Sequence, residues 1–149
     1  MQTRTVRTVV YLAAGIGMVI SIFAAAELLD TALRSVCSYS AFFSCSAVDS
    51  SGKTTFLWIP DYAWGIGGFI GIMIVNALAE SRPDDNLGAY GLLALTTAGI
   101  GLALYFLYVE LALINAFCVV CFAAYLAGFV AWAGAIELTR RTRIANAPA

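Results

Sequence analysis

Four long apolar stretches, each bounded by charged or polar residues, divide the chain at about residues 9–29, 62–79, 87–109 and 115–136. A bilayer core about 30 Å thick requires roughly 20 apolar residues in a helix, which is close to the length of each stretch. The pattern therefore predicts an all-α membrane protein, a bundle of four transmembrane helices in a single domain over residues 1–149. We expect Asn115 to be the N-cap of the last helix.

The first stretch follows Arg4 and Arg7, as the apolar part of a signal peptide follows its basic residues. It lacks a convincing cleavage site and continues into Glu27, so we interpret it as a retained span. The connection that follows, about residues 30–61, is long and rich in serine. We expect this loop to cap a site formed by the outer ends of the helices.

Composition strengthens the membrane assignment, because only 11% of residues are charged, against about 25% in soluble proteins. The net charge of −1 provides no basic surface for nucleic acid. Cytoplasmic segments of membrane proteins carry an excess of Lys and Arg. The first loop has Arg34 and Lys53, whereas the two ends and the second connection have the remaining basic residues: Arg4, Arg7, Arg82, Arg140, Arg141 and Arg143. This bias predicts cytoplasmic termini and an extracytoplasmic first loop.

Four cysteines form two pairs, Cys37 with Cys45 in the first loop and Cys118 with Cys121 at the start of the fourth span. The predicted topology brings all four to the extracytoplasmic side, where disulfides persist. A thiol pair transfers two electrons when it closes to a disulfide, so two pairs that meet can form a relay. The chain has no histidine, which removes Cys/His zinc sites and histidine bases from consideration.

Cys118 and Cys121 form a CxxC motif whose two sulfurs share one helical face, and a helix N-terminus there would favour the thiolate. Simple packing of two small apolar side chains is an alternative. A permanent structural disulfide is an alternative for Cys37 and Cys45. A zinc site of all four cysteines is a further alternative, although the seven residues between Cys37 and Cys45 exceed the usual two to four.

Oxidation of a dithiol needs a two-electron acceptor, and a quinone dissolved in the bilayer suits this role best. No dinucleotide-binding fingerprint offers another acceptor, because Gly65, Gly67 and Gly68 lie inside an apolar span with no preceding strand. The apolar residues 56–60 are too few to span the membrane, and we expect Trp58 at the headgroup level. This segment caps a pocket or simply anchors the second span.

Several of these residues together resemble the vitamin K epoxide reductase (VKOR) family, over most of the chain. The seven-residue separation of the loop cysteines is similar to that of the family, and residues 45–51 fit its CSxVxxS pattern. Ile59 and Pro60, followed by Gly65, resemble the opening of its second span. The CxxC motif with Tyr125 four residues later completes the resemblance.

The resemblance implies a four-helix bundle around a quinone of the menaquinone, ubiquinone or vitamin K type, without a metal. It implies that Cys121 reacts with the quinone, that Cys118 is its partner, that Cys45 exchanges with Cys118, and that Cys37 exchanges with a partner protein. Tyr125 would donate a hydrogen bond to one quinone carbonyl. Asp61 stands where the family commonly has asparagine, so it either replaces the amide in protonated form or caps the second helix. Ser51 would support the site or pack within the loop.

The expected function is therefore that of a membrane thiol–quinone oxidoreductase that supports disulfide formation in exported proteins. Many bacterial relatives carry a fused thioredoxin-like domain; none follows Arg143 here, so we expect the thioredoxin-like partner to be a separate chain. Reduction of vitamin K epoxide is an alternative. A disulfide-stapled structural or transport protein is another, but transport would need charge within the spans. The acidic residues are instead expected at the span ends: Glu27, Glu80, Glu110 and Glu137.

Overall fold

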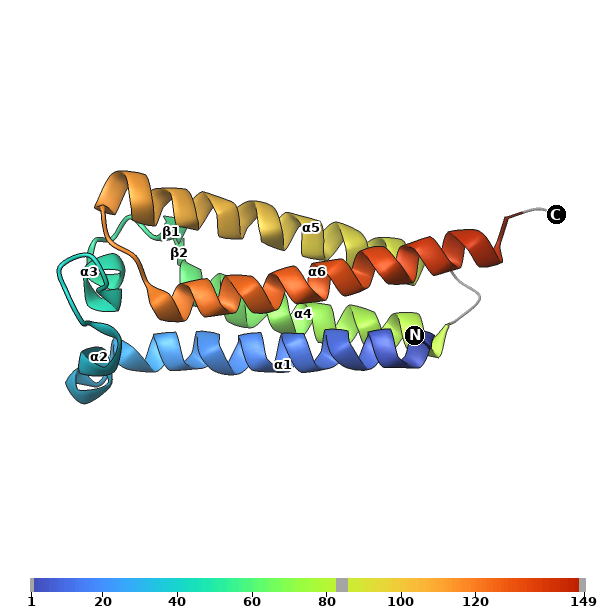
Figure 1. The fold of residues 1–149 in the computed structure, drawn as a ribbon, viewed down its shortest axis with the longest axis horizontal. Helices are drawn as coiled ribbons and strands as arrows, with labels where there is room; N and C mark the ends of the chain where they lie inside the picture. The colour runs from blue at the N-terminus through green and yellow to red at the C-terminus, as the bar shows by residue number, and fades with distance from the viewer. Residues whose placement is uncertain (1, 83–85, 148–149) are drawn as a thin grey trace.

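Four long helices lie side by side along the molecule (Figure 1). The computed structural model describes residues 2–82 and 86–147. The helices are α1 (Thr3–Glu27), α4 (Asp61–Ser81), α5 (Asn86–Tyr108), which continues into the π-helix η1 (Val109–Ile114), and α6 (Val119–Ala145). All four are long and apolar enough to cross a membrane. The predicted all-α bundle of four spans is confirmed, and the chain is a multi-pass membrane protein.

Small residues allow the helices of the bundle to approach closely. Gly17 of α1 lies against the ring of Phe69 of α4, and Gly134 of α6 lies against Val10 of α1. Leu92 and Ala131 are fully buried at the centre of the bundle. Many of the outward-facing side chains are large and apolar, which suits contact with lipid rather than water.

A polar clasp holds α1 to α4 at the end of the bundle where α1 begins. The Arg7 guanidinium donates to the backbone oxygen of Asn76 at 3.2 Å and to that of Ala79 at 3.0 Å. The Asn76 amide, which is fully buried, donates back to the Arg7 carbonyl at 3.3 Å. These contacts satisfy polar groups that would otherwise be costly inside an apolar bundle.

The connection between α1 and α4 folds over the opposite end of the bundle (Figure 1). It contains the short helices α2 (Thr31–Cys37) and α3 (Cys45–Ser50) and the strands β1 (Thr55–Phe56) and β2 (Ile59–Pro60). Asp30 and Ser44 cap the two helices by accepting the N–H groups of Ala32 and Ala47. The polar residues of this connection therefore build local structure, since Asp and Ser are favoured at N-caps.

The two strands pair antiparallel and form a hairpin whose two-residue turn is Leu57 and Trp58. Both tip residues have a positive φ, 52° and 69°, which a tight hairpin turn requires and which glycine or asparagine adopts more easily. Trp58 is 98% exposed. An exposed tryptophan on a strained turn suits a contact at the membrane interface.

The passage from the third to the fourth span differs from the expected one. Asn115 does not begin a helix: its φ of 58° is left-handed, and its N–H bonds to the Glu110 carbonyl at the end of η1. The fourth long helix begins at Val119 with Cys118 as its N-cap, because the Cys118 sulfur accepts the Cys121 N–H at 3.2 Å. The four residues 115–118 therefore connect two helices instead of belonging to one.

Candidate redox site and quinone cavity

All four cysteines are buried at the end of the bundle covered by α2 and α3. Cys37 ends α2 and Cys45 begins α3, and the two form a disulfide with Cα atoms 5.6 Å apart. Cys118 and Cys121 form the second disulfide, with Cα atoms 5.2 Å apart. The exposed fraction of each cysteine is 6% or less.

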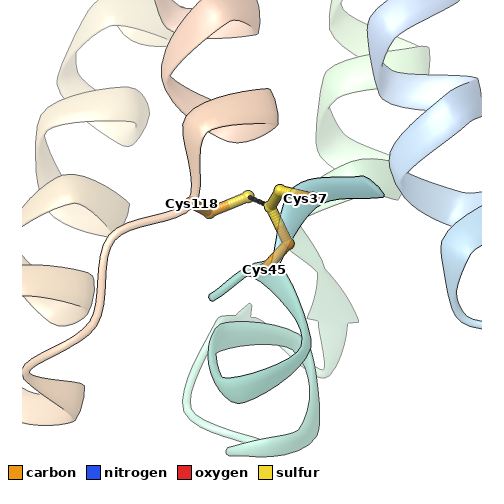
Figure 2. A group of neighbouring side chains, drawn as sticks. All are labelled: Cys37, Cys45 and Cys118. Carbon is orange, nitrogen blue, oxygen red and sulfur yellow. Dashed lines mark hydrogen bonds between the residues drawn. A yellow bond between two sulfur atoms is a disulfide. The ribbon is translucent and has the colours of Figure 1, made fainter. Parts of the chain in front are cut away.

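The two disulfides meet through Cys45 and Cys118. Their Sγ atoms are 3.1 Å apart, and Figure 2 shows the Cys118 side chain directed toward the Cys37–Cys45 bond. Both sulfurs are in disulfides and carry no proton, so this is a nonbonded approach and not a hydrogen bond. The Phe117 N–H donates to the Phe42 carbonyl at 2.7 Å and fixes the two cysteine segments beside each other.

The sulfurs of Cys37, Cys45 and Cys118 all lie within 4.8 Å of one another. If all three were reduced, this spacing would suit thiolate ligands of a metal ion. In the present state each sulfur is bonded to another sulfur. The arrangement therefore fits disulfide exchange directly, and a metal would first require reduction of both bonds.

Cys121 faces a cavity between the four spans. The cavity has a volume of about 110 Å³, far above the roughly 15 Å³ that one water molecule requires. Its walls are mainly apolar and include Phe69 and Phe106, with Cys121, Asp61 and Tyr125 among its few reactive or polar side chains. Mainly apolar walls with a few convergent polar groups are typical of a small-molecule site. These residues fit a quinone ring.

Asp61 is the first residue of α4 and lies beside Cys121. Its Oδ1 accepts the Tyr62 N–H at 2.7 Å, and its Oδ2 is 3.7 Å from the Cys121 sulfur. A disulfide sulfur has no proton to donate, so a hydrogen bond between these atoms requires a protonated carboxyl group. One oxygen thus bonds within the first turn of α4, whose N-cap is Pro60, while the other faces the Cys121 sulfur.

Tyr125 lies in the cavity wall, one turn after Cys121. It bonds to Glu110, a residue that we did not expect at the site from the sequence. Its hydroxyl donates to Glu110 Oε1 at 2.8 Å. Glu110 was expected at the end of the third span, and it does lie near that end, but its exposed fraction is 0%. The sequence contained one sign that Glu110 belongs to the site. It is an acidic residue in an apolar segment, eight positions before Cys118, and charge within a span is usually functional.

Ser51 lies outside the cavity wall. Its hydroxyl donates to the Val48 carbonyl at 2.7 Å and accepts the Lys53 N–H at 3.2 Å, so it shapes the end of α3. Asp49 of the same helix belongs to the electrostatics of the site. Burial is the main cause that raises the pKa of its carboxyl group from 3.8 to about 7, and neighbouring acidic residues raise it further: Asp61, Glu27 and Glu110.

Comparison with known proteins agrees with this geometry. No curated protein matches the chain. The model of the vitamin K epoxide reductase family matches residues 8–136, a range that contains both disulfides and the cavity. Because this match covers most of the sequence, the chain belongs to the vitamin K epoxide reductase family and is, by that membership, an oxidoreductase.

Proposed function

We propose that the protein is a membrane thiol–quinone oxidoreductase that carries electrons from a thioredoxin-like partner to a membrane quinone. The observation that carries the proposal is the sequence of contacts at the site. The Cys37–Cys45 disulfide touches Cys118 at 3.1 Å, and the disulfide partner of Cys118, Cys121, lies in the wall of an apolar cavity. Two electrons can therefore pass between the pairs by exchange between adjacent sulfurs.

In the relay, the reduced Cys45 thiolate attacks the Cys118 sulfur. The Cys45–Cys118 bond forms, the Cys118–Cys121 bond breaks, and Cys121 leaves as a thiolate. Cys37 then attacks Cys45, restores the Cys37–Cys45 disulfide and releases Cys118. The result is a transfer of two electrons and two protons to the second pair.

The cavity residues prepare the second pair for oxidation. A quinone bound in the cavity would supply the two-electron acceptor. Tyr125 would hold one carbonyl of the quinone once its hydroxyl turns from Glu110 Oε1 toward the cavity, and Asp61 would hold or exchange a proton beside Cys121. Closing the Cys118–Cys121 bond releases two electrons and two protons, which a quinone takes up to become a quinol.

The partner protein must gain access to a buried disulfide. Cys37 is only 3% exposed, so the segment between α2 and α3 has to move before an outside thiolate can attack. This segment exposes Tyr39, Phe42 and Phe43, which offer an apolar surface to a partner. With both termini in the cytoplasm, the site lies on the extracytoplasmic side, and the output is disulfide formation in exported proteins.

The test uses purified protein with a water-soluble quinone and either a small dithiol or a reduced thioredoxin-like protein. Cys121→Ser should abolish quinone reduction with both donors, because it removes the sulfur in the cavity wall. Cys37→Ser should retain reduction by the small dithiol and lose reduction by the protein donor. Full activity of Cys121→Ser contradicts the proposal, and stoichiometric zinc in the reduced wild type would favour the metal site instead.

A further inference from the structure

Three serine hydroxyls form a hydrogen-bonded cluster beside the Cys37–Cys45 disulfide. Ser38 directly follows Cys37, and Ser44 and Ser46 stand on either side of Cys45. The hydroxyl oxygens of Ser38 and Ser46 lie 3.2 Å apart, and those of Ser44 and Ser46 lie 3.1 Å apart. The Ser44 hydroxyl also lies 3.5 Å from that of Ser38. The cluster therefore joins the two chain segments that carry the loop cysteines.

The segment between the two cysteines is also closed by its own backbone. The Tyr39 N–H donates to the Phe43 carbonyl at 2.9 Å, and the Ser44 N–H donates to the Phe42 carbonyl at 3.1 Å. Neither these backbone bonds nor the bonds between the three hydroxyls involve a cysteine sulfur. Opening the disulfide therefore breaks none of them.

The proposed relay leaves Cys37 without a sulfur partner at one stage, while Cys45 is joined to Cys118. The mixed disulfide can then react in two directions. Attack of the Cys37 thiolate on the Cys45 sulfur forms the Cys37–Cys45 bond, breaks the Cys45–Cys118 bond and releases Cys118 as a thiolate. Attack of Cys121 on Cys118 instead restores the second disulfide and releases Cys45. Electrons stay with the second pair only through the first reaction, whose rate depends on how closely Cys37 is held beside Cys45.

We infer that Ser38 and Ser46 are positioning residues that hold Cys37 beside Cys45 while the disulfide between them is open. The inference rests on the proposed function. The two serines repeat the spacing of the two cysteines one position further along the chain, so the bond between their hydroxyls joins the same two segments as the disulfide. Without this bond, the segment that carries the free Cys37 gains conformational freedom, and closing the pair again must pay the entropy of ordering it.

The decisive variant is Ser38→Ala, which removes the bond to Ser46 and retains Ser44 as the cap of α3. In protein that also carries Cys118→Ser and Cys121→Ser, only the loop pair remains. Its closure is measured as an equilibrium with reduced and oxidised glutathione. We expect Ser38→Ala to lower the equilibrium constant for closure by about 5-fold, the factor that corresponds to one hydrogen bond of about 1 kcal/mol.

Two further variants show whether the hydroxyl at this position is responsible. Ser38→Thr retains a hydroxyl and should restore closure. Ser35→Ala is the matched control, because the Ser35 hydroxyl donates to the Ala32 carbonyl within α2 and should not affect the cysteines. An equal loss of closure in Ser35→Ala would overturn the inference.

A double-mutant cycle tests whether the two serines act through one bond. Ser46→Ala removes the other side of the bond, so it also provides the test if Ser38→Ala does not fold. The double variant should close no less well than the weaker single variant, because either change removes the same bond. Unchanged closure in both single variants, or effects that multiply in the double variant, would overturn the inference.

A second measurement separates positioning of Cys37 from a general loosening of the loop. In protein with Cys37→Ser and Cys121→Ser, the disulfide between Cys45 and Cys118 forms without Cys37. Ser38→Ala should leave the yield of this disulfide unchanged, whereas a loosened loop would lower it. A fall in this yield as large as the fall in loop closure overturns the inference.

These measurements need neither quinone nor a partner protein, so they separate the inference from the proposed function. During turnover with quinone and a small dithiol, Ser38→Ala should accumulate the Cys45–Cys118 mixed disulfide, which mass spectrometry of acid-quenched samples detects. Absence of quinone reduction in the wild type would instead contradict the proposed function.

Discussion

The sulfur atoms of Cys45 and Cys118 lie 3.1 Å apart, although 73 positions separate the two residues in the sequence. Buried neighbours surround this contact, among them Val48 and Ala116, so the proposed exchange between the two pairs would proceed away from water. Small molecules in solution would otherwise intercept a thiolate during transfer. The loop would thus shield the thiolates of the proposed exchange, as well as the disulfides, from small molecules in solution.

This contact predicts which mixed disulfide can be trapped. A Cys37→Ser, Cys121→Ser double variant retains only Cys45 and Cys118, and these should form a disulfide nearly quantitatively under mild oxidation. Mass spectrometry of proteolytic fragments under non-reducing conditions measures its yield. The control variant, Cys37→Ser with Cys118→Ser, retains Cys45 and Cys121 and should give a much lower yield. Equal yields would mean that the contact between Cys45 and Cys118 does not direct the exchange.

Asp61→Asn tests the role of the carboxyl group beside Cys121. Asparagine can still accept the Tyr62 N–H and can donate to the quinone at any pH, whereas aspartate donates only when protonated. We expect quinone reduction by the wild type to fall at high pH and the variant to lose this fall. The measurement is the rate of quinone reduction across a pH series. Superimposable pH profiles would show that Asp61 acts only at the start of α4.

Asp49 predicts a pH dependence of stability. The pKa of its carboxyl group is about 7 in the folded protein against 3.8 ordinarily, so the folded state binds more protons between these values. The free energy of unfolding should therefore fall as the pH rises from about 4 to about 7, and level off above that. Asp49→Asn should flatten this slope in thermal unfolding of the detergent-solubilised protein. Asp30→Asn, an exposed cap in the same connection, should retain it.

Close packing of α1 against α4 predicts a difference between two glycines of one helix. A Cβ atom at Gly17 would collide with the Phe69 ring, whereas one at Gly15 meets nothing within 4 Å. Overpacking typically costs about 1–3 kcal/mol, so Gly17→Ala should lower the midpoint of thermal unfolding. Gly15→Ala should leave it unchanged or raise it, because alanine favours the helix. Equal midpoints would contradict the packing described for these helices.

The sequence predicts the parts of this protein that depend on composition over long windows. Hydropathy places the four spans, and spacing pairs the cysteines, since both signals are carried by many residues or by a rare residue type. The role of Glu110 depends on a π-helical turn and on a partner, Tyr125, fifteen positions later. Nothing local in the sequence marks such a turn. The expectation that Asn115 is an N-cap was wrong for a similar reason. Asparagine is favoured both at N-caps and in left-handed positions, and here it takes the left-handed position at the end of η1.

The position of Cys118 as the N-cap of α6 has a consequence for the direction of electron flow. Its sulfur accepts the Cys121 N–H at the positive end of the helix dipole. When Cys37 releases Cys118 from the mixed disulfide in the proposed relay, Cys118 becomes an anion at this position, and the helix stabilises the anion more than it stabilises the neutral disulfide sulfur. The reduced pair is thereby favoured, which makes this disulfide the stronger oxidant, as in oxidising thiol proteins. In the proposed relay, the first turn of α6 thus favours the transfer of electrons from the loop cysteines to Cys118 and Cys121.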